Sequence, residues 1–338
     1  MIITRTPFRI SFFGGGTDYP DWFREHGGAV LATSIDKYCY LTVRHLPPFF
    51  EHKHRIVWSR VELTRSVEEI QHPAVRAILA EMNGSDEAQG YEIHHDGDLP
   101  ARAGLGSSSS FAVGLVNAMH ALNGRMVSKQ ELAKEAIRIE QDVLRENVGC
   151  QDQVTTAHGG FNRIDFHRNG GIDINPIILP RETLNQLQDS MLLVFTGISR
   201  YASEIAAKQI DNLKARTNEL AAMQQMVDEA TSILRGANDP VESFGRLLNE
   251  NWKLKRSLAK EITTDRINEI YDAAMAGGAY GGKLLGAGGG GFMLFVVPEA
   301  CKQSVKDRLQ TLINVRFQFE TSGSKVLYAE RDEWDNGG

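Results

Sequence analysis

Apolar and polar residues alternate strongly at the start of the chain. Apolar side chains recur along residues 2–13 up to three consecutive glycines, and residues 30–43 continue with the same kind of pattern. A period of two places every second side chain on one face, which is the pattern of a half-buried strand. The sequence therefore predicts two strands here, and the short segment 91–94 predicts a third.

Helical spacing replaces this alternation in the middle of the chain. An apolar run predicts a helix over 107–120, and Ser128-Lys-Gln-Glu131 has the form of a capping box that opens a second helix, which continues to about residue 147. The segment 147–153 is rich in turn-forming residues, and short strands are expected after the glycine pair at 159–160. We therefore expect two helices, then a turn, and then further strands.

The second half of the chain is more helical than the first. Strands are predicted at 191–195 and 292–297, and helices at 199–235, 241–260, 267–275 and 299–313. Strands and helices interleave without a regular β-α repeat, so the pattern favours an α+β fold over a doubly wound sheet. A domain boundary is expected near 180–190, which divides the chain into 1–185 and 186–338.

Composition and charge narrow the class of protein. With 338 residues, 42% of them hydrophobic and 24% charged, the chain has the values of an ordinary globular protein of one or two domains. The net charge of −6 argues against a general binder of nucleic acid or anionic membranes. Three widely spaced cysteines, without a CxxC pair, fit a reduced protein better than a disulfide scaffold or a zinc site. We expect a cytoplasmic protein without a signal peptide or a membrane-spanning segment.

The glycine-rich segment 100–110 is the first candidate for chemistry. Gly104 and Gly106 precede four serines, from Ser107 to Ser110, that lead directly into an apolar run. Glycines let backbone N–H groups converge, and a helix that begins at the serines directs its free N–H groups and its positive dipole end to the same point. This arrangement suits a phosphate, although no Gly-Lys-Ser/Thr of a Walker A loop follows. A plain turn with a serine cap is the alternative.

Two more segments share this character, because each is rich in glycine, carries charge and lies at the end of a predicted element. The first covers residues 9–19 and the second covers 283–291. Together with 100–110, and in this order, they resemble the three motifs of the GHMP kinases, the family of galactokinase, homoserine kinase, mevalonate kinase and phosphomevalonate kinase. The resemblance covers nearly the whole chain. It implies an α+β fold of two domains, the N-terminal one (1–185) like ribosomal protein S5 and the C-terminal one (186–338) ferredoxin-like.

For the nucleotide side of the reaction, the resemblance implies ATP and Mg²⁺ as cofactors. The residues that it implies for ATP binding are Gly104, Leu105, Gly106, Ser107, Ser108, Ser109, Gly288 and Gly289. Ser108 is also implied as a magnesium ligand, with Glu140 on the following helix as the second ligand. Hydroxyl and carboxylate oxygens are hard ligands of the kind that Mg²⁺ takes. For Glu140, a solvated position on a helix is the alternative.

On the acceptor side, Asp152 resembles the family's catalytic aspartate. A carboxylate beside the acceptor hydroxyl can take or orient its proton as the phosphoryl group arrives. Arg9 stands where family members place Lys or Arg. A fixed cation there lowers the pKa of the hydroxyl and offsets the charge on the transferred group. The alternative for Arg9 is a surface residue at the end of a strand.

The segment Gly15-Gly16-Thr17-Asp18-Tyr19 is implied to bind the substrate. Its Thr-Asp-Tyr resembles the galactokinases, in which the aspartate accepts hydrogen bonds from sugar hydroxyls. Gly15 and Gly16 stand where galactokinases carry a Glu-His pair, which argues against galactose. An aspartate in an ordinary turn is the alternative for Asp18.

Residues 8–19 and 146–153 look most like the D-glycero-D-manno-heptose 7-phosphate kinases of this family. The similarity implies ATP-dependent phosphorylation of the anomeric hydroxyl of the heptose 7-phosphate, which gives the 1,7-bisphosphate for nucleotide-activated heptose and surface polysaccharide. Ser199 and Arg200, at the expected start of a helix, are candidates for binding the sugar phosphate. The alternatives are a galactokinase-like or fucokinase-like kinase of an unphosphorylated sugar, and a non-catalytic relative that binds sugar or nucleotide. The expected partners are small molecules, and the oligomeric state stays open, a homodimer included.

Overall fold

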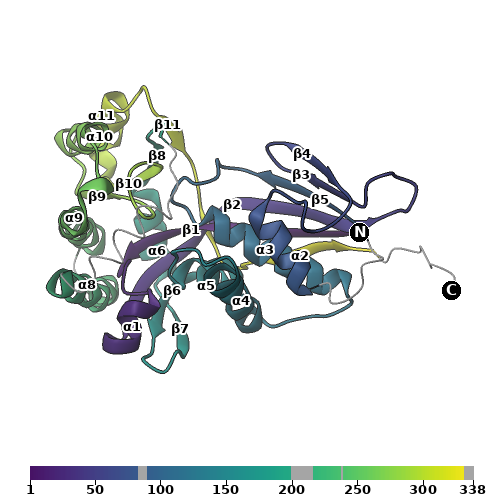
Figure 1. Ribbon diagram of the computed structural model, residues 1–338. Helices are drawn as coiled ribbons and strands as arrows, with labels where there is room; N and C mark the ends of the chain where they lie inside the picture. The colour runs from purple at the N-terminus through teal and green to yellow at the C-terminus, as the bar shows by residue number, and fades with distance from the viewer. Residues whose placement is uncertain (83–89, 199–215, 237–238, 331–338) are drawn as a thin grey trace.

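The computed structural model describes residues 1–82, 90–198, 216–236 and 239–330. In these residues the chain forms two sheets with helices around them (Figure 1). Within the same ranges, no helix combines the length and the apolar character that crossing a bilayer requires.

The first sheet is built around two long antiparallel strands, β1 (Ile2–Phe13) and β2 (Gly28–Leu46), which the short helix α1 (Pro20–His26) connects. Its main order is β13-β1-β2-β5-β3-β4, while β6 and β12 also pair with β2, and β7 pairs with β6. The further strands are β3 (His54–Val57), β4 (Val61–Thr64), β5 (Gly90–Gly97), β6 (Phe161–Phe166), β7 (Ile172–Pro176), β12 (Phe319–Glu320) and β13 (Lys325–Ala329). β3 runs parallel to β5, and the other pairs in this sheet are antiparallel.

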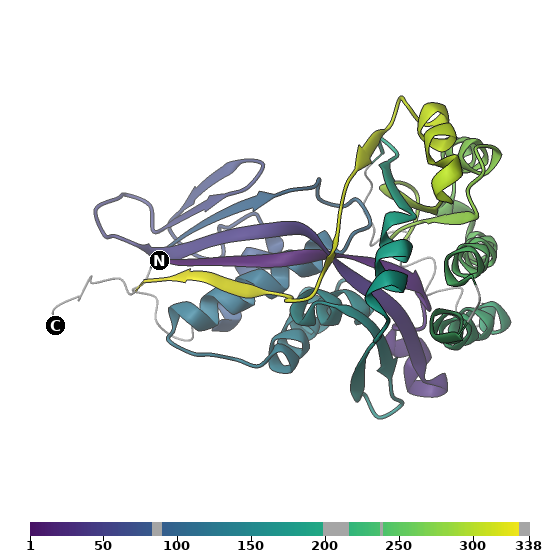
Figure 2. The ribbon, with the colours of Figure 1, turned by 180° about the vertical axis from the view of Figure 1, so that it is seen from behind.

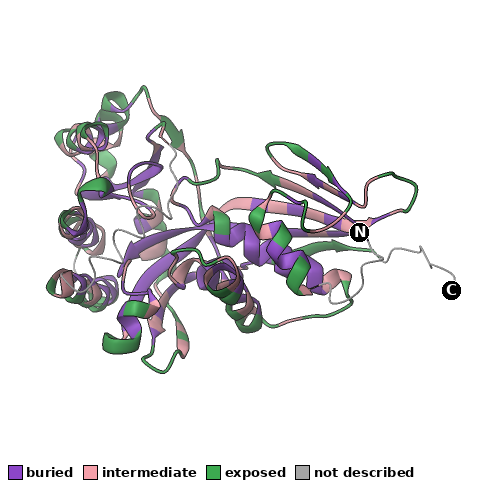
Figure 3. Cartoon of the chain, in the orientation of Figure 1, coloured by how far each residue is buried: buried purple, intermediate pink, exposed green. Residues whose placement is uncertain are grey.

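A layer of helices lies on one face of this sheet (Figure 1). It consists of α2 (Pro73–Met82), α3 (Ser107–Leu122), α4 (Lys129–Arg138) with the π-helix η1 (Ile139–Val143), and α5 (Gln151–His158). Figure 2 shows the strands in front of these helices from the opposite side. α3 packs against β1 and β2 and is mostly buried, as Figure 3 shows, because the sheet and the neighbouring helices enclose it.

The second sheet has four strands in the order β11-β8-β10-β9, all in antiparallel pairs. Their bounds are β8 (Met191–Phe195), β9 (Gly281–Leu284), β10 (Phe292–Val296) and β11 (Ile313–Val315). The helices of this half are α6 (Arg181–Asp189), α8 (Thr217–Gly236), α9 (Pro240–Leu258), α10 (Asp265–Ala276) and α11 (Lys302–Arg308), with the short 3₁₀ turns η3 (Lys260–Ile262) and η4 (Glu299–Cys301). In Figure 1, α8 to α11 line the outer side of the molecule, at the left. The two-sheet α+β architecture is the one that the sequence predicts.

The end of the chain returns to the first sheet. β13 pairs with β1, β12 pairs with β2, and Figure 2 shows this yellow segment crossing from the second half to the first. The predicted division at 185/186 assigns both strands to the second domain, whereas their hydrogen bonds are to strands of the N-terminal half. The division itself stays a prediction.

Most predicted elements are present, and three need correction. The helix predicted to continue to about residue 147 ends earlier, because α4 ends at Arg138 and the π-helix η1 that continues it ends at Val143. The capping box is formed, since the backbone N–H of Glu131 donates to Ser128 Oγ and the N–H of Ser128 donates to Glu131 Oε2. The segment 147–153 is not all turn, because α5 begins at Gln151. The predicted helix 299–313 ends at Arg308, since the residues that follow supply the strand β11 beside β8. Of the predicted helix 199–235, α8 covers 217–235, and 199–215 lie outside the described residues.

The C-terminal half of β1 lies between the two halves of the molecule. From Thr6 to Phe13 every residue of this strand is buried. Helices α3 and α5 of the first half and α8 and α9 of the second half all contact β1. A charged side chain in this part of the strand is therefore enclosed and needs a partner.

Candidate active site

The charged residue of buried β1 is Arg9, and its partner is Asp152. Arg9 Nε donates to Asp152 Oδ1 at 2.7 Å and Arg9 Nη2 donates to Oδ2 at 2.6 Å, which makes a two-bond pair of planar groups. The side chain of Arg9 is 5% exposed and that of Asp152 is 24% exposed. The alternative for Arg9, a surface residue at a strand end, is therefore wrong. Asp152, in the first turn of α5, is the more exposed member of the pair.

Arg9 also holds the loop 100–110. Its Nη1 donates to the carbonyl of Gly104 at 2.7 Å, and its backbone N–H donates to the carbonyl of Leu105 at 3.0 Å. Gly106 closes against this pair, since a Cβ there would lie 3.0 Å from Arg9 Cγ and 3.4 Å from Asp152 Oδ2. The first motif, the glycine loop and Asp152 therefore meet at one point.

The loop ends in the helix start that the sequence predicts. Gly106 is the N-cap of α3 with a φ of 73°, in the left-handed region that favours glycine. The N-cap residue is a glycine, which has no side chain to cap the helix, so the alternative of a serine cap is wrong. Ser107 instead accepts a hydrogen bond from the N–H of Arg102 within the loop, at 3.0 Å. The first-turn N–H groups and the helix dipole are thus directed out of the helix end, as a phosphate requires.

Glu140 is buried beside this helix start. It lies in the π-helical turn η1 and is 3% exposed, so the alternative of a solvated helix residue is wrong. Ser109 Oγ donates to its Oε2 at 2.7 Å, and Gln153 Nε2 donates to the same oxygen at 2.5 Å. Burial raises the pKa of Glu140 to about 7. The predicted partner Ser108 is exposed in the first turn, and Ser109 is the serine that contacts Glu140.

These oxygens fit a magnesium ion. A divalent cation would favour the ionised form of Glu140, which burial now opposes. Among the described residues, no three His, Cys, Asp or Glu side chains gather as a metal cage built from protein alone would require. Mg²⁺ is commonly held by one or two carboxylates together with substrate phosphates. Glu140 and the serines at the start of α3 offer oxygen ligands of this kind.

Asp18 is a second buried carboxyl near Asp152. Its Oδ1 accepts hydrogen bonds from Gly16 N at 3.1 Å and from Gln151 Nε2 at 3.0 Å, and its Oδ2 accepts from Gln151 N at 3.2 Å. It is 1% exposed, and burial together with the charge of Asp152 raises its pKa to about 6. Gly149 provides the space, because a Cβ there would lie 1.9 Å from Asp18 Oδ2. Asp18 is not a free turn residue.

The neighbours of Asp18 differ in what they can offer a substrate. Thr17 is fully buried, and its hydroxyl bonds to the backbone of Gly14 and Ala29, so it shapes the loop. Tyr19 is also buried. Gly15 and Gly16 are half-buried, and the atoms nearest to a Cβ at Gly15 would be Gln151 Nε2 and Ser11 Oγ, both at 3.9 Å. Space therefore remains beside Gly15.

The third glycine segment packs directly on the first loop. A Cβ on Gly286 would lie 2.5 Å from Gly104 Cα, and the N–H of Phe292 donates to the carbonyl of Ala103 at 3.1 Å. Gly288 and Gly289 lie against η3, where the N–H of Gly289 donates to the carbonyl of Ile262 at 2.9 Å. The two loops are thus brought together, as the sequence predicts.

Sequence reasoning missed several residues of this site. Gln151 and Gln153 bracket Asp152 in the sequence and bind Asp18 and Glu140, and their spacing around the aspartate is the signal that could have found them. Lys255 and Lys283 are buried close to Arg9, and Lys283 is the first residue of the third glycine segment. Ser199 and Arg200 lie outside the described residues.

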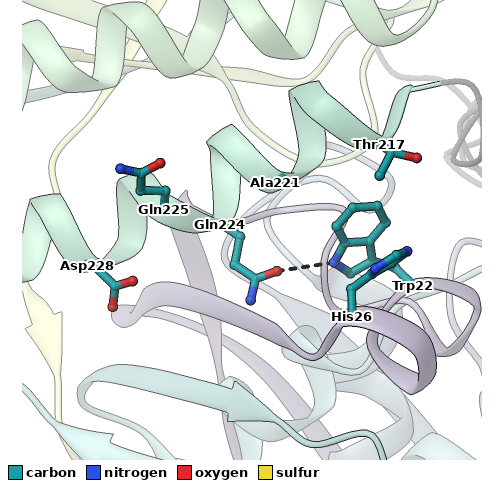
Figure 4. A pocket seen from close by; sticks show the side chains of 7 residues that line it. All are labelled: Trp22, His26, Thr217, Ala221, Gln224, Gln225 and Asp228. Atoms are coloured by element: carbon teal, nitrogen blue, oxygen red, sulfur yellow. Dashed lines mark hydrogen bonds between the residues drawn. The ribbon is translucent and has the colours of Figure 1, made fainter.

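A separate surface pocket of about 330 Å³ opens between α1 and α8 (Figure 4). Its lining is Trp22, His26, Thr217, Ala221, Gln224, Gln225 and Asp228. Trp22 Nε1 donates to Gln224 Oε1 across it at 3.2 Å. It contains none of the residues predicted for the active site.

Comparison with known proteins gives matches to both halves of the chain. The family profile described as GHMP kinases N terminal domain matches residues 68–160, and the profile described as GHMP kinases C terminal matches 237–314. A D-glycero-alpha-D-manno-heptose 7-phosphate kinase of Campylobacter jejuni is 27% identical over 318 residues, which are 90% of this chain and 91% of that protein. A mevalonate kinase of Pyrococcus horikoshii is 31% identical over 230 residues, which are 66% of this chain and 64% of that protein.

A solved structure carries the same fold. A D-glycero-D-manno-heptose 1-phosphate kinase from Bacteroides thetaiotaomicron superposes with a TM-score of 0.78 at 24% identity, over 98% of this chain and 100% of that chain. Since profiles of one family match the two halves in order, and the motifs of that family meet around Arg9, we conclude that this chain belongs to the GHMP kinases and is an ATP-dependent kinase that acts on a hydroxyl acceptor.

Proposed function

We propose that this enzyme phosphorylates the anomeric hydroxyl of D-glycero-D-manno-heptose 7-phosphate in the cytoplasm, giving the 1,7-bisphosphate for nucleotide-activated heptose and surface polysaccharide. The position of Asp152 is the observation that supports a sugar as the acceptor. Arg9 holds Asp152 between the glycine loop and Asp18. The Campylobacter jejuni relative supports the heptose 7-phosphate as the specific acceptor.

The geometry supports the following roles. Asp152 accepts or orients the proton of the anomeric hydroxyl while the hydroxyl oxygen forms its bond to phosphorus and the bond between phosphorus and ADP breaks. Arg9 keeps the carboxylate in place and offsets charge on the transferred group. The start of α3 binds phosphate, and Glu140 with the adjacent serines holds Mg²⁺. ATP with Mg²⁺, when bound, supplies the phosphoryl group and neutralises its charge.

The sugar lies against the segment from Gly15 to Tyr19. The side-chain amide nitrogen of Gln151 donates to Asp18, so the amide oxygen of Gln151 is the atom left to accept a hydrogen bond from a sugar hydroxyl. Gln151 Oε1 and Ser11 Oγ are buried and have no hydrogen-bond partner within the described part of the chain, which a substrate hydroxyl would correct. Ser199 and Arg200 remain the proposed contacts for the 7-phosphate.

A panel of acceptors in a coupled ADP-release assay tests this function. We expect turnover with the heptose 7-phosphate and little with the unphosphorylated heptose, galactose, fucose or mevalonate, and a new anomeric phosphate by ³¹P NMR. Arg200→Ala should raise KM for the sugar phosphate. Faster turnover with an unphosphorylated sugar than with the heptose 7-phosphate would contradict the proposed substrate. Saturable sugar binding without any turnover would indicate a non-catalytic protein.

A further inference from the structure

Two buried lysines lie at the junction of the glycine loops, and neither contacts an acidic side chain within the described residues. Lys255, on α9, is 8% exposed and donates from Nζ to the carbonyls of Leu284 at 2.9 Å and Gly286 at 2.5 Å. Lys283, on β9, is 3% exposed and donates from Nζ to the carbonyl of Phe12 at 2.7 Å. In the described residues, the charges that act on Lys255 and Lys283 are positive, from Arg9 and, for Lys283, also from Lys255.

This arrangement is unfavourable for the empty protein. Burial and the charge of Arg9 lower the pKa of Lys255 to about 7, and burial with the charges of Lys255 and Arg9 lowers the pKa of Lys283 well below its usual value. Arg9 itself is matched by Asp152, so the carboxylate leaves no negative charge for the lysines. Buried ammonium groups are retained where a counter-charge reaches them.

The position of the two lysines indicates which anion supplies this counter-charge. Lys255 binds both sides of the turn at Leu285, and this turn contacts the phosphate loop through Gly286 and Gly104. Lys283 binds the strand that carries Arg9, three residues beyond it. Both amines therefore lie close to Arg9, where the strand β1 meets the glycine loops.

We propose that Lys255 and Lys283 form a cationic site for the phosphoryl group that is transferred, which is the terminal phosphate of ATP. Each ammonium has three N–H groups, and the contacts described use two on Lys255 and one on Lys283, so N–H donors remain for phosphate oxygens. The proposal rests on phosphoryl transfer from ATP, and it holds for any sugar acceptor.

Binding of ATP should then draw a proton into the site. Arg9 from β1 and Lys283 from β9 face Lys255, β10 brings no titratable side chain, and the charged residues of α6, α8 and η3 lie at exposed or half-exposed positions. With a pKa of about 7, Lys255 is about one-tenth protonated at pH 8 in the empty protein. At that pH the phosphates of ATP are fully ionised. We expect uptake of about one proton by Lys255, and of up to a second by Lys283, per bound Mg·ATP, and clearly less with Mg·ADP. Titration calorimetry in buffers of different ionisation enthalpy measures this uptake.

Substitutions separate this role from a structural one. Lys255→Met and Lys283→Met keep the apolar stem of the side chain. Each should weaken ATP binding by at least about tenfold, since one charge-assisted contact contributes about tenfold to affinity, and should change ADP affinity by less than about threefold. Lys255→Arg should recover part of the loss. Lys253→Met, on the same helix at an exposed position, is the matched control and should bind both nucleotides as the unchanged protein does.

Three outcomes would overturn the proposal. Equal losses of ATP and ADP affinity would make the lysines supports of the loop, and unchanged ATP affinity would exclude them from the site. Absence of proton uptake by the unchanged protein would do the same, even if the methionine variants fail to fold. Failure of every sugar in the acceptor panel would overturn the proposed substrate and leave these nucleotide measurements intact.

Discussion

Replacing Glu140 by glutamine should stabilise the metal-free protein and impair its use of magnesium. The folded structure opposes ionisation of this buried carboxyl, since its pKa rises from about 4.5 to about 7. That difference corresponds to roughly 3 kcal/mol of lost stability at pH 8. Glutamine has the same shape and no charge. Its oxygen can accept from Ser109 and Gln153, and its amide can face Gln153 Oε1, which is buried without a partner in the described residues.

The stability gained by Glu140→Gln should increase with pH. The unfolded chain ionises Glu140 near pH 4.5 and the folded chain near pH 7, so the cost is absent at low pH, grows between these values and is complete above them. Urea unfolding with a chelator present should show Glu140→Gln more stable by about 1 kcal/mol at pH 5 and about 3 kcal/mol at pH 8. The larger gain is about 4 °C in Tm for a chain of this size.

The control for this prediction is Asp142→Asn, an exposed residue of the same π-helical turn, which should change stability little. In the ADP-release assay, Glu140→Gln should raise the magnesium concentration for half-maximal rate by at least about tenfold. An equal gain in stability at both pH values, or none at pH 8, would refute the electrostatic reasoning. A normal magnesium requirement would refute the assignment of Glu140 as a ligand.

Three further substitutions test the acceptor side of the site. Asp152→Asn should lower kcat by about a hundredfold or more, and near-normal turnover of the folded variant would remove Asp152 from proton handling. Gly15→Ala should raise KM for the sugar several-fold and leave KM for ATP unchanged, because the added methyl occupies space whose nearest atoms in the described residues lie at 3.9 Å. Its control is Gly236→Ala, where a Cβ meets no atom of the described residues within 4 Å. Gly149→Ala should destabilise the fold by about 2 kcal/mol or more in urea unfolding, because its Cβ would lie 1.9 Å from Asp18 Oδ2, and an unchanged midpoint would contradict the reported contact.

The parts of the site that the sequence predicts are those held by local chemistry. The glycines of 104–106 and the helix after them form a motif over a few residues, and the structure has the helix start where the motif predicts it. Asp152 lies on a helix that the sequence does not predict, because the turn-forming residues before it hide the start of α5. The strands β12 and β13 are also absent from the prediction, since such short segments are defined by their pairing with β1 and β2.

Lys255 shows why the remaining site residues escape a sequence analysis. It lies in a charged amphipathic helix between Lys253 and Arg256, and nothing in that pattern separates a buried lysine from its exposed neighbours. Its burial depends on the packing of α9 against β9 and on two carbonyls 29 and 31 residues further along the chain. Such a contact is a property of the tertiary structure.

The ionisable groups of this site are perturbed in opposite directions, and this has a single explanation. Burial raises the pKa of the acids Asp18 and Glu140, and it lowers the pKa of the amines Lys255 and Lys283. The acids and amines make no ion pairs with each other among the described contacts, so they do not relieve one another. A ligand that carries both signs relieves both groups, since Mg²⁺ favours ionised Glu140 and the phosphates favour charged amines. Mg·ATP should therefore stabilise the protein more than the metal or the nucleotide does alone, because each half leaves the other set of buried charges uncompensated.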